Sequence, residues 1–124
     1  MRTVLIALIA LLPATALADR SYNSEQNVTH DCAKDAKVSV NASGGTYTFT
    51  GPCDKIAING SDNKIKVASV AKLAINGSKN TADVDAVDKL AVTGSENTVT
   101  YKRGVSGKPK VASLGTNNKI SLVK

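Results

Sequence analysis

The sequence contains no tryptophan and only four aromatic residues, Tyr22, Tyr47, Phe49 and Tyr101. Proteins that hold single-stranded nucleic acid stack its bases on several aromatic side chains. Four aromatic residues are too few for such a platform, and they also disfavour a sugar cleft lined with aromatic rings. We therefore expect no sequence-specific binding of nucleic acid.

Metal ligands are equally scarce, because the chain has one histidine, His30, and two cysteines, Cys32 and Cys53. A structural zinc site needs four such ligands. His30 also lacks a serine or cysteine partner that the sequence places nearby. The sequence thus predicts no metal site, no cofactor and no catalytic residues built on these side chains.

A long hydrophobic run is also missing. The one apolar stretch covers residues 4–12, whereas a membrane-spanning helix needs about 20 residues. Arg2 before this stretch and Ala16-Leu17-Ala18 after it complete the pattern of a secretory signal peptide over residues 1–18. No cysteine follows the expected cut before Asp19, so we expect a periplasmic or secreted protein without a lipid anchor there.

Removal of residues 1–18 takes away one charge, that of Arg2, and leaves 15 basic and 10 acidic residues. The remaining 106 residues suffice for one domain with a modest core. Because an exported protein meets oxidising conditions, we expect Cys32 and Cys53 to form a disulfide.

The positive evidence is an internal repeat. Four segments superpose, and they begin at Lys55, Lys72, Lys89 and Lys110. Their glycines, Gly60, Gly77, Gly94 and Gly115, are 17, 17 and 21 residues apart, and a weaker copy starts at Lys37. A constant period of this kind is typical of repeat architectures.

Within each copy the apolar residues alternate, which indicates two short strands. The segment Asn-Gly-Ser-x-Asn between them predicts a turn, because glycine and asparagine tolerate positive φ. Asn-Gly can also mark a hairpin, so an antiparallel β-meander or barrel is the alternative fold. The constant period and the recurring polar residues favour an all-β, single-domain β-solenoid of about five coils with about 17 residues each.

In stacked coils, equivalent residues lie about 4.8 Å apart. The side-chain amides of equivalent asparagines then hydrogen-bond from coil to coil. We predict such a ladder for the asparagine that ends each turn. Its members are Asn63, Asn80, Asn97 and Asn118.

The same stacking predicts four columns of inward side chains. The columns are Val38, Ile56, Leu73, Leu90 and Val111; Val40, Ile58, Ile75 and Val92, with Ser113 as a departure; Tyr47, Ile65, Ala82, Val99 and Ile120; and Phe49, Val67, Val84, Tyr101 and Leu122. The two cysteines are 21 residues apart, about one coil, so a Cys32–Cys53 disulfide would pin residues 19–36 as an N-terminal cap on a repeat domain of residues 37–124.

In three of the copies, inward aliphatic residues are followed by a similar turn segment. The segments are Asn59-Gly60-Ser61-Asp62-Asn63, Asn76-Gly77-Ser78-Lys79-Asn80 and Thr93-Gly94-Ser95-Glu96-Asn97. This pattern behind a signal peptide resembles the bacterial domain-of-unknown-function family 3060. The resemblance covers about residues 37–124. It implies an exported or surface-attached bacterial β-solenoid, and it transfers no activity and no functional residues.

An enzyme is one alternative, because some β-helical proteins cleave polysaccharides. Asp83 and Asp85 are close enough in sequence for paired carboxylate chemistry. Stacking places Asp83 between Lys66 and Thr100, which is an ordinary surface arrangement. We therefore expect a protein that is not an enzyme.

The residue before the first strand is lysine in all five copies. The predicted column consists of Lys37, Lys55, Lys72, Lys89 and Lys110. Beside it runs a row of small residues, Ser39, Ala57, Ala74, Ala91 and Ala112. The lysine column is the candidate anion-binding surface of the sequence.

Two functional hypotheses follow. The first is a non-catalytic envelope module whose basic face binds an anionic envelope polymer or an acidic protein surface. The second is a structural or self-assembling protein that forms homo-oligomers through its C-terminal edge or through the row of alanines. A third interpretation gives the lysines no ligand, because lysine next to a sheet also prevents aggregation between edges.

Overall fold

The computed structural model describes residues 20–123 and contains strands and turns over this range, with no helix. The predicted signal peptide, residues 1–18, lies outside the described residues. The strands are β1 (Arg20–Tyr22), β2 (Asn27–Asp31), β3 (Lys37–Asn41), β4 (Thr46–Asn59), β5 (Lys64–Ser78), β6 (Thr81–Ser95), β7 (Thr98–Arg103), β8 (Lys110–Thr116) and β9 (Lys119–Leu122).

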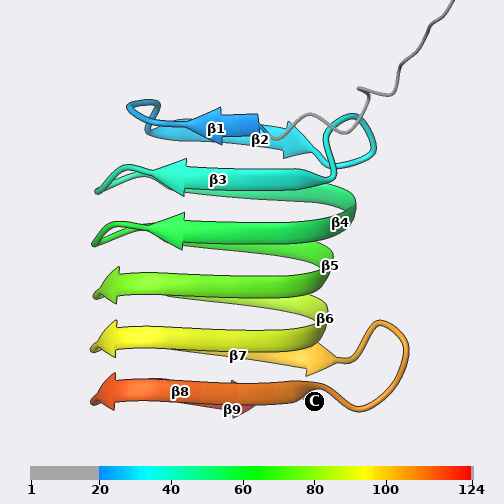
Figure 1. The fold of residues 1–124 in the computed structure, drawn as a ribbon, viewed down its shortest axis with the longest axis vertical. Coiled ribbons are helices and arrows are strands. Elements are labelled where there is room, and N and C mark those ends of the chain that lie inside the picture. Colours follow the sequence, from blue (N-terminus) through cyan, green and yellow to red (C-terminus); the bar gives the residue numbers. More distant parts are fainter. Residues whose placement is uncertain (1–19, 124) are drawn as a thin grey trace, which may run out of the picture.

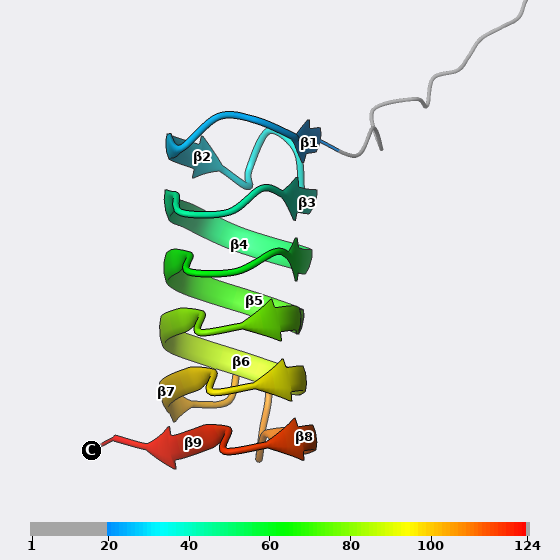
Figure 2. The ribbon, with the colours of Figure 1, turned by 90° about the vertical axis from the view of Figure 1, so that its left-hand side faces the viewer.

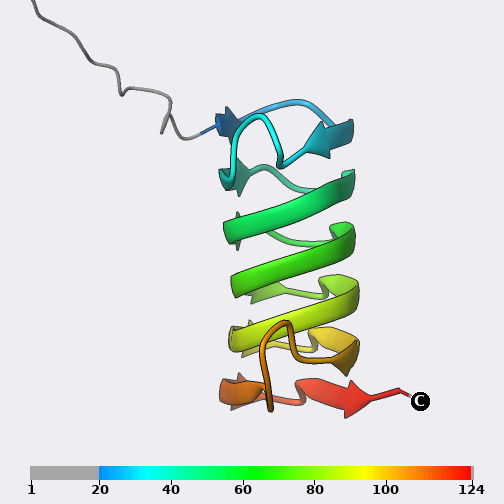
Figure 3. The same cartoon turned by 90° about the vertical axis from the view of Figure 1, so that its right-hand side faces the viewer.

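The strands wind into a stack of coils with two layers (Figure 1). The long strands β4, β5 and β6 each bend, so that the first half of each lies in one layer and the second half in the other (Figure 3). The Asn-Gly-Ser-x-Asn turns lie together on the opposite side of the stack (Figure 2). The repeat thus supplies one bend and one turn per coil.

Every strand pair is parallel, and the register is that of the aligned repeats. Arg20, Val38, Ile56, Leu73, Leu90 and Val111 follow one another across neighbouring strands. The predicted β-solenoid is therefore confirmed. The antiparallel meander or barrel is excluded, because it would need antiparallel pairs.

The column that starts at Arg20 has six members, one more than the five coils counted from the sequence. The additional coil comes from the segment that we expected to be a cap. In it, β1 pairs with β3 and β2 pairs with β4 in the same parallel arrangement as the later coils. Residues 20–31 therefore continue the solenoid.

The interior contains the predicted columns of aliphatic and aromatic side chains. Ile56, Leu73 and Leu90 are at most 1% exposed. Val70 and Val87, a third inward position at the bend, are fully buried, and Cys53 lies at the same position in the preceding coil. Each full coil buries about five such groups at roughly 1.5–3 kcal/mol each, so stability depends on stacking.

Two predicted core positions are not core. Val111 is 41% exposed and Leu122 is 54% exposed, although both continue buried columns. They belong to the last described coil, which is covered by β6 and β7 on one side only. Val111 and Leu122 are exposed because no described strand covers their other side.

The turn glycines are required by the close approach of the coils. A Cβ atom on Gly77 would lie 1.8 Å from the carbonyl oxygen of Gly60 in the preceding coil, so no other residue fits. The left-handed conformation occurs at the variable position of the turn, with φ of 56° at Lys79 and 57° at Glu96. The turn asparagines Asn63, Asn80 and Asn97 do not have positive φ.

Candidate functional site

The five predicted lysines form one column in the structure. The strand register places Lys37 beside Lys55, Lys55 beside Lys72, Lys72 beside Lys89, and Lys89 beside Lys110. At about 4.8 Å per coil, the column is about 19 Å long. All five side chains are exposed, and they lie in the layer that contains β3 and β8.

These lysines carry charge that no neighbouring carboxylate neutralises by direct contact. The one ion pair among residues 20–123 joins Arg103 Nη2 to Asp85 Oδ2 at 3.3 Å, in the other layer. Asp88, which the sequence places next to Lys89, instead accepts hydrogen bonds from residues 105 and 106. The column is therefore a surface of concentrated positive charge.

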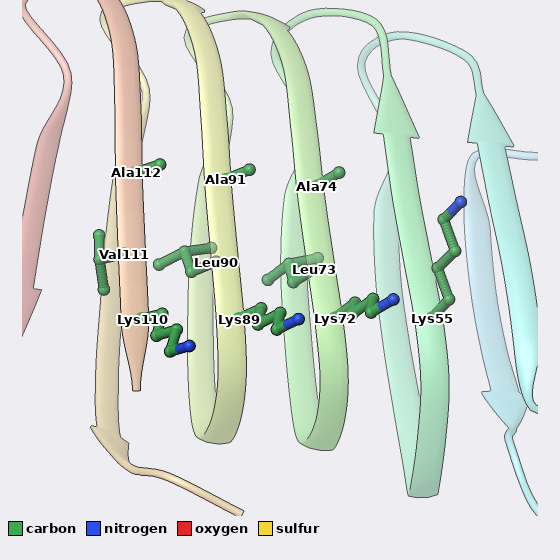
Figure 4. A pocket seen from close by; sticks show the side chains of 10 residues that line it. All are labelled: Lys55, Lys72, Leu73, Ala74, Lys89, Leu90, Ala91, Lys110, Val111 and Ala112. Carbon is green, nitrogen blue, oxygen red and sulfur yellow. The ribbon is translucent and has the colours of Figure 1, made fainter. Parts of the chain in front are cut away.

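A groove of about 450 Å³ runs along the column (Figure 4). On one side it is lined by Lys55, Lys72, Lys89 and Lys110, and on the other by the methyl groups of Ala74, Ala91 and Ala112. The side chains of Lys72, Lys89 and Lys110 extend in the same direction along the stack (Figure 4). The small side chains leave this face of the sheet open, so a flat or extended molecule can approach the ammonium groups.

The segment between β7 and β8 extends the basic face. Lys108 and Gly107 line a second hollow of about 200 Å³ together with Lys89 and Lys110. Asp88 holds this loop, because its carboxylate accepts hydrogen bonds from the backbone N–H and the hydroxyl of Ser106 and from the N–H of Val105, at 2.8 to 2.9 Å. These donors hold the pKa of Asp88 below its ordinary value.

The predicted asparagine ladder is present between Asn80, Asn97 and Asn118, whereas the side chain of Asn63 donates to the carbonyl oxygen of Ala42. Asn80 Nδ2 donates to Asn97 Oδ1 at 3.1 Å, and Asn97 Nδ2 donates to Asn118 Oδ1 at 3.1 Å. The same two oxygens also accept the backbone N–H groups of Asn80 and Asn97, and Asn80 Oδ1 accepts the backbone N–H of Asn63. The ladder therefore secures the turns, and its buried members Asn63, Asn80 and Asn97 offer no polar group to a ligand.

A second asparagine ladder was missed at the sequence level. Asn41 donates to Asn23, Asn59 to Asn41, and Asn76 to Asn59, each from Nδ2 to Oδ1 at 3.0 to 3.1 Å on the exposed side. The signal was available, because Asn41, Asn59 and Asn76 align in the repeat. As members of Asn-Gly-Ser-x-Asn, Asn59 and Asn76 were interpreted only as turn residues.

The two cysteines form the expected disulfide, with their Cα atoms 4.9 Å apart. Next to it, His30 is buried and held at both ring nitrogens. Nδ1 lies 2.7 Å from the hydroxyl of Tyr22, and Nε2 lies 2.9 Å from the carbonyl oxygen of Asp35. Because both nitrogens are occupied, His30 is a structural residue of the first coil.

The carboxylates considered for catalysis are engaged in surface contacts. Asp83 lies between Lys66 and Thr100 in the register, as predicted, and accepts a hydrogen bond from the Thr100 hydroxyl at 3.4 Å. Asp85 pairs with Arg103. In the part of the chain that the structure describes, no three His, Cys, Asp or Glu residues are arranged to hold a metal ion.

Residues 20–123 contain no helix that is long and apolar enough to cross a membrane. What the fold and the site define is a small, disulfide-bonded, parallel β-solenoid with one basic, grooved face. The model of the family described as protein of unknown function, DUF3060, matches residues 40–81 and 70–117. This match covers more than half of the chain, so the chain belongs to the DUF3060 family. No curated protein and no solved structure matches it.

Proposed function

We propose that this protein is a non-catalytic binding module of the bacterial envelope, and that its lysine column binds an anionic envelope polymer. The observation that carries the proposal is the alignment of five unpaired lysines beside an open groove of small side chains. The disulfide is consistent with export to the periplasm or beyond. An acidic protein surface is the alternative ligand of the same chemistry.

The column is unfavourable without a ligand. Two ammonium groups 4.8 Å apart repel by about 0.9 kcal/mol in water, before the flexible side chains move apart. An anionic polymer relieves several of these repulsions at once, because its charges also repeat along a line. The groove supports this geometry, since it runs along the stack in the same direction as the column.

The competing interpretation is that the lysines only keep edges from aggregating. The column does not follow the edge of one strand. It crosses neighbouring strands that are already paired, at the first residue of β3 and of β8 and at the equivalent residues of β4, β5 and β6. Lysines that prevent pairing between strand edges are needed on the first and last strands. They are not needed at Lys55 or Lys72, because the strands there already have partners on both sides. This position favours a ligand for the column.

The experiment compares two triple variants of equal charge. The column variant is Lys55→Glu, Lys72→Glu and Lys89→Glu, and the matched control is Lys64→Glu, Lys79→Glu and Lys102→Glu. The probes are polygalacturonate and inorganic polyphosphate, with titration calorimetry at 0.1 M salt. We expect the column variant to lose at least tenfold in affinity and the control to lose far less.

Salt provides a second measurement on the unmodified protein. Raising the salt from 0.1 M to 1 M shortens the Debye length from about 10 Å to about 3 Å, and this should release the polymer. Equal losses in the two triple variants would mean that net charge alone matters. Aggregation of the column variant without any change in binding would establish the aggregation-blocking role instead.

A further inference from the structure

The last described coil, formed by β8 and β9, has a neighbouring coil on one side only. Among residues 20–123, the outer edges of β8 and β9 pair with no other strand, and both lie at the end of the stack (Figure 1). Val111, Leu122 and Val123, at 41%, 54% and 38% exposure, lie on these two strands or directly after them. This face is equivalent to the one that β6 and β7 present to β8 and β9.

Backbone N–H and carbonyl groups on this face also favour a strand as the partner, because a strand can form hydrogen bonds with them. In the inner coils the asparagine N–H donates to the next asparagine, as Asn97 does to Asn118, and the glycine carbonyl accepts from the next asparagine, as Gly94 does. The repeat directs the N–H of Asn118 and the carbonyl of Gly115 to the open end in the same way. An apolar ligand would leave such groups without hydrogen bonds, whereas a strand edge provides them.

The N-terminal face of a second copy is a poor partner. The register places Arg20 in the column of Val111, and its guanidinium carbon lies 5.0 Å from the centre of the Tyr22 ring. Stacking head to tail would press this charged group against Val111. Burial of a charge without a partner is costly, so the N-terminal face ends the stack.

We propose that the C-terminal face binds the C-terminal face of a second copy, related by a two-fold axis, with β8 antiparallel to β8 of the partner copy. Such a contact closes on itself and gives a dimer. The partner copy then covers the exposed side chains of Val111 and Leu122. Because both copies present the same coil shape at the same strand spacing, each edge finds a strand to pair with.

Charge is compatible with this arrangement. Centring the pair of strands on Ser113 places Lys110 of one copy opposite Thr116 of the other. The two Lys110 residues are then six strand positions apart, about 20 Å, which exceeds the Debye length of about 10 Å at 0.1 M salt. The antiparallel direction thus separates the like charges that a parallel pair would bring together.

The test is the mass of the full exported protein in solution, measured by light scattering and sedimentation over a concentration series. We expect twice the monomer mass at high concentration, with no further growth. Val111→Asp, at a position already 41% exposed, should restore the monomer mass without loss of the strand signal in circular dichroism. Val105→Asp is the matched control, because Val105 is 45% exposed but lies on the loop before β8.

Three outcomes would overturn the proposal. They are a monomer at the highest concentration, a dimer that persists in Val111→Asp, and a mass that grows without limit, which is the signature of head-to-tail stacking. A cysteine at the two-fold axis gives a measurement that does not depend on weakening the contact. Ser113→Cys should form a covalent dimer under oxidation, whereas Ser24→Cys at the other end should stay monomeric.

Discussion

The first and last coils of the solenoid have the same strand arrangement but differ in how their interior side chains are covered. At the N-terminal end, Tyr22 and His30 are buried and hydrogen-bonded, and a disulfide joins the first coil to the next. At the C-terminal end, Val111 and Leu122 continue the core columns and are exposed. In this architecture a core position is therefore defined by its neighbours along the stack, and the repeat alone does not make it buried.

The largest effect is expected from removal of the disulfide at the N-terminal end. Replacing both Cys32 and Cys53 by serine should lower the free energy of unfolding by roughly 3 kcal/mol, because the bridge closes a loop of 21 residues. Urea denaturation of the variant and of the parent protein measures this difference. The rate of hydrogen exchange should rise first in β1 and β2, so that the N-terminal coil would be held only by stacking, as the C-terminal coil is. An unchanged free energy of unfolding would contradict the stabilising role of the disulfide.

A smaller effect is expected when the same substitution, valine to alanine, is made at each end of the stack. Val38 and Val111 lie in the same column, but Val38 is 2% exposed and Val111 is 41% exposed. Val38→Ala should cost about 2 kcal/mol, since it removes buried methyl groups and leaves a cavity. Val111→Ala should change the stability of the monomer by no more than about 0.5 kcal/mol.

Thermal or urea unfolding at low protein concentration, where the proposed dimer is dissociated, checks this pair. Similar losses in the two variants would mean that something buries Val111 in solution. A loss in Val111→Ala that appears only at high concentration would connect the exposed end to the proposed dimer.

Most of the fold could be predicted because the repeat gives the register directly. Once Gly60, Gly77 and Gly94 are aligned, the strand pairs, the inward columns and the buried Asn80 follow from a spacing of one coil. The disulfide followed for the same reason, since Cys32 and Cys53 are about one coil apart.

Apart from the second asparagine ladder, the missed features are those that the repeat pattern does not encode. The segment 20–31 has no clear repeat motif, so it was expected to be a cap, but its backbone pairs as a further coil. The exposure of Leu122 depends on what lies beyond it and not on its own alternation. The lysine column was predictable as geometry, whereas its ligand depends on a partner molecule that no residue of this chain specifies.

The smallest effect concerns the loop that only the C-terminal half of the molecule has. Asp88 anchors residues 105 and 106 through three hydrogen bonds, and the Ser106 N–H and hydroxyl and the Val105 N–H keep its pKa below the usual value of about 3.9. A carboxylate with a lowered pKa in the folded state stabilises that state above its unfolded pKa, and the contribution disappears as the pH falls through the folded pKa. The melting temperature of the parent protein should therefore exceed that of Asp88→Asn at pH 6, and the gap should close below pH 3.9 as the carboxylate is protonated.

Asp83→Asn serves as the control, because Asp83 has one long contact with the Thr100 hydroxyl. A gap for Asp88→Asn that is independent of pH would show that the loop is held by shape and not by the charge of this carboxylate.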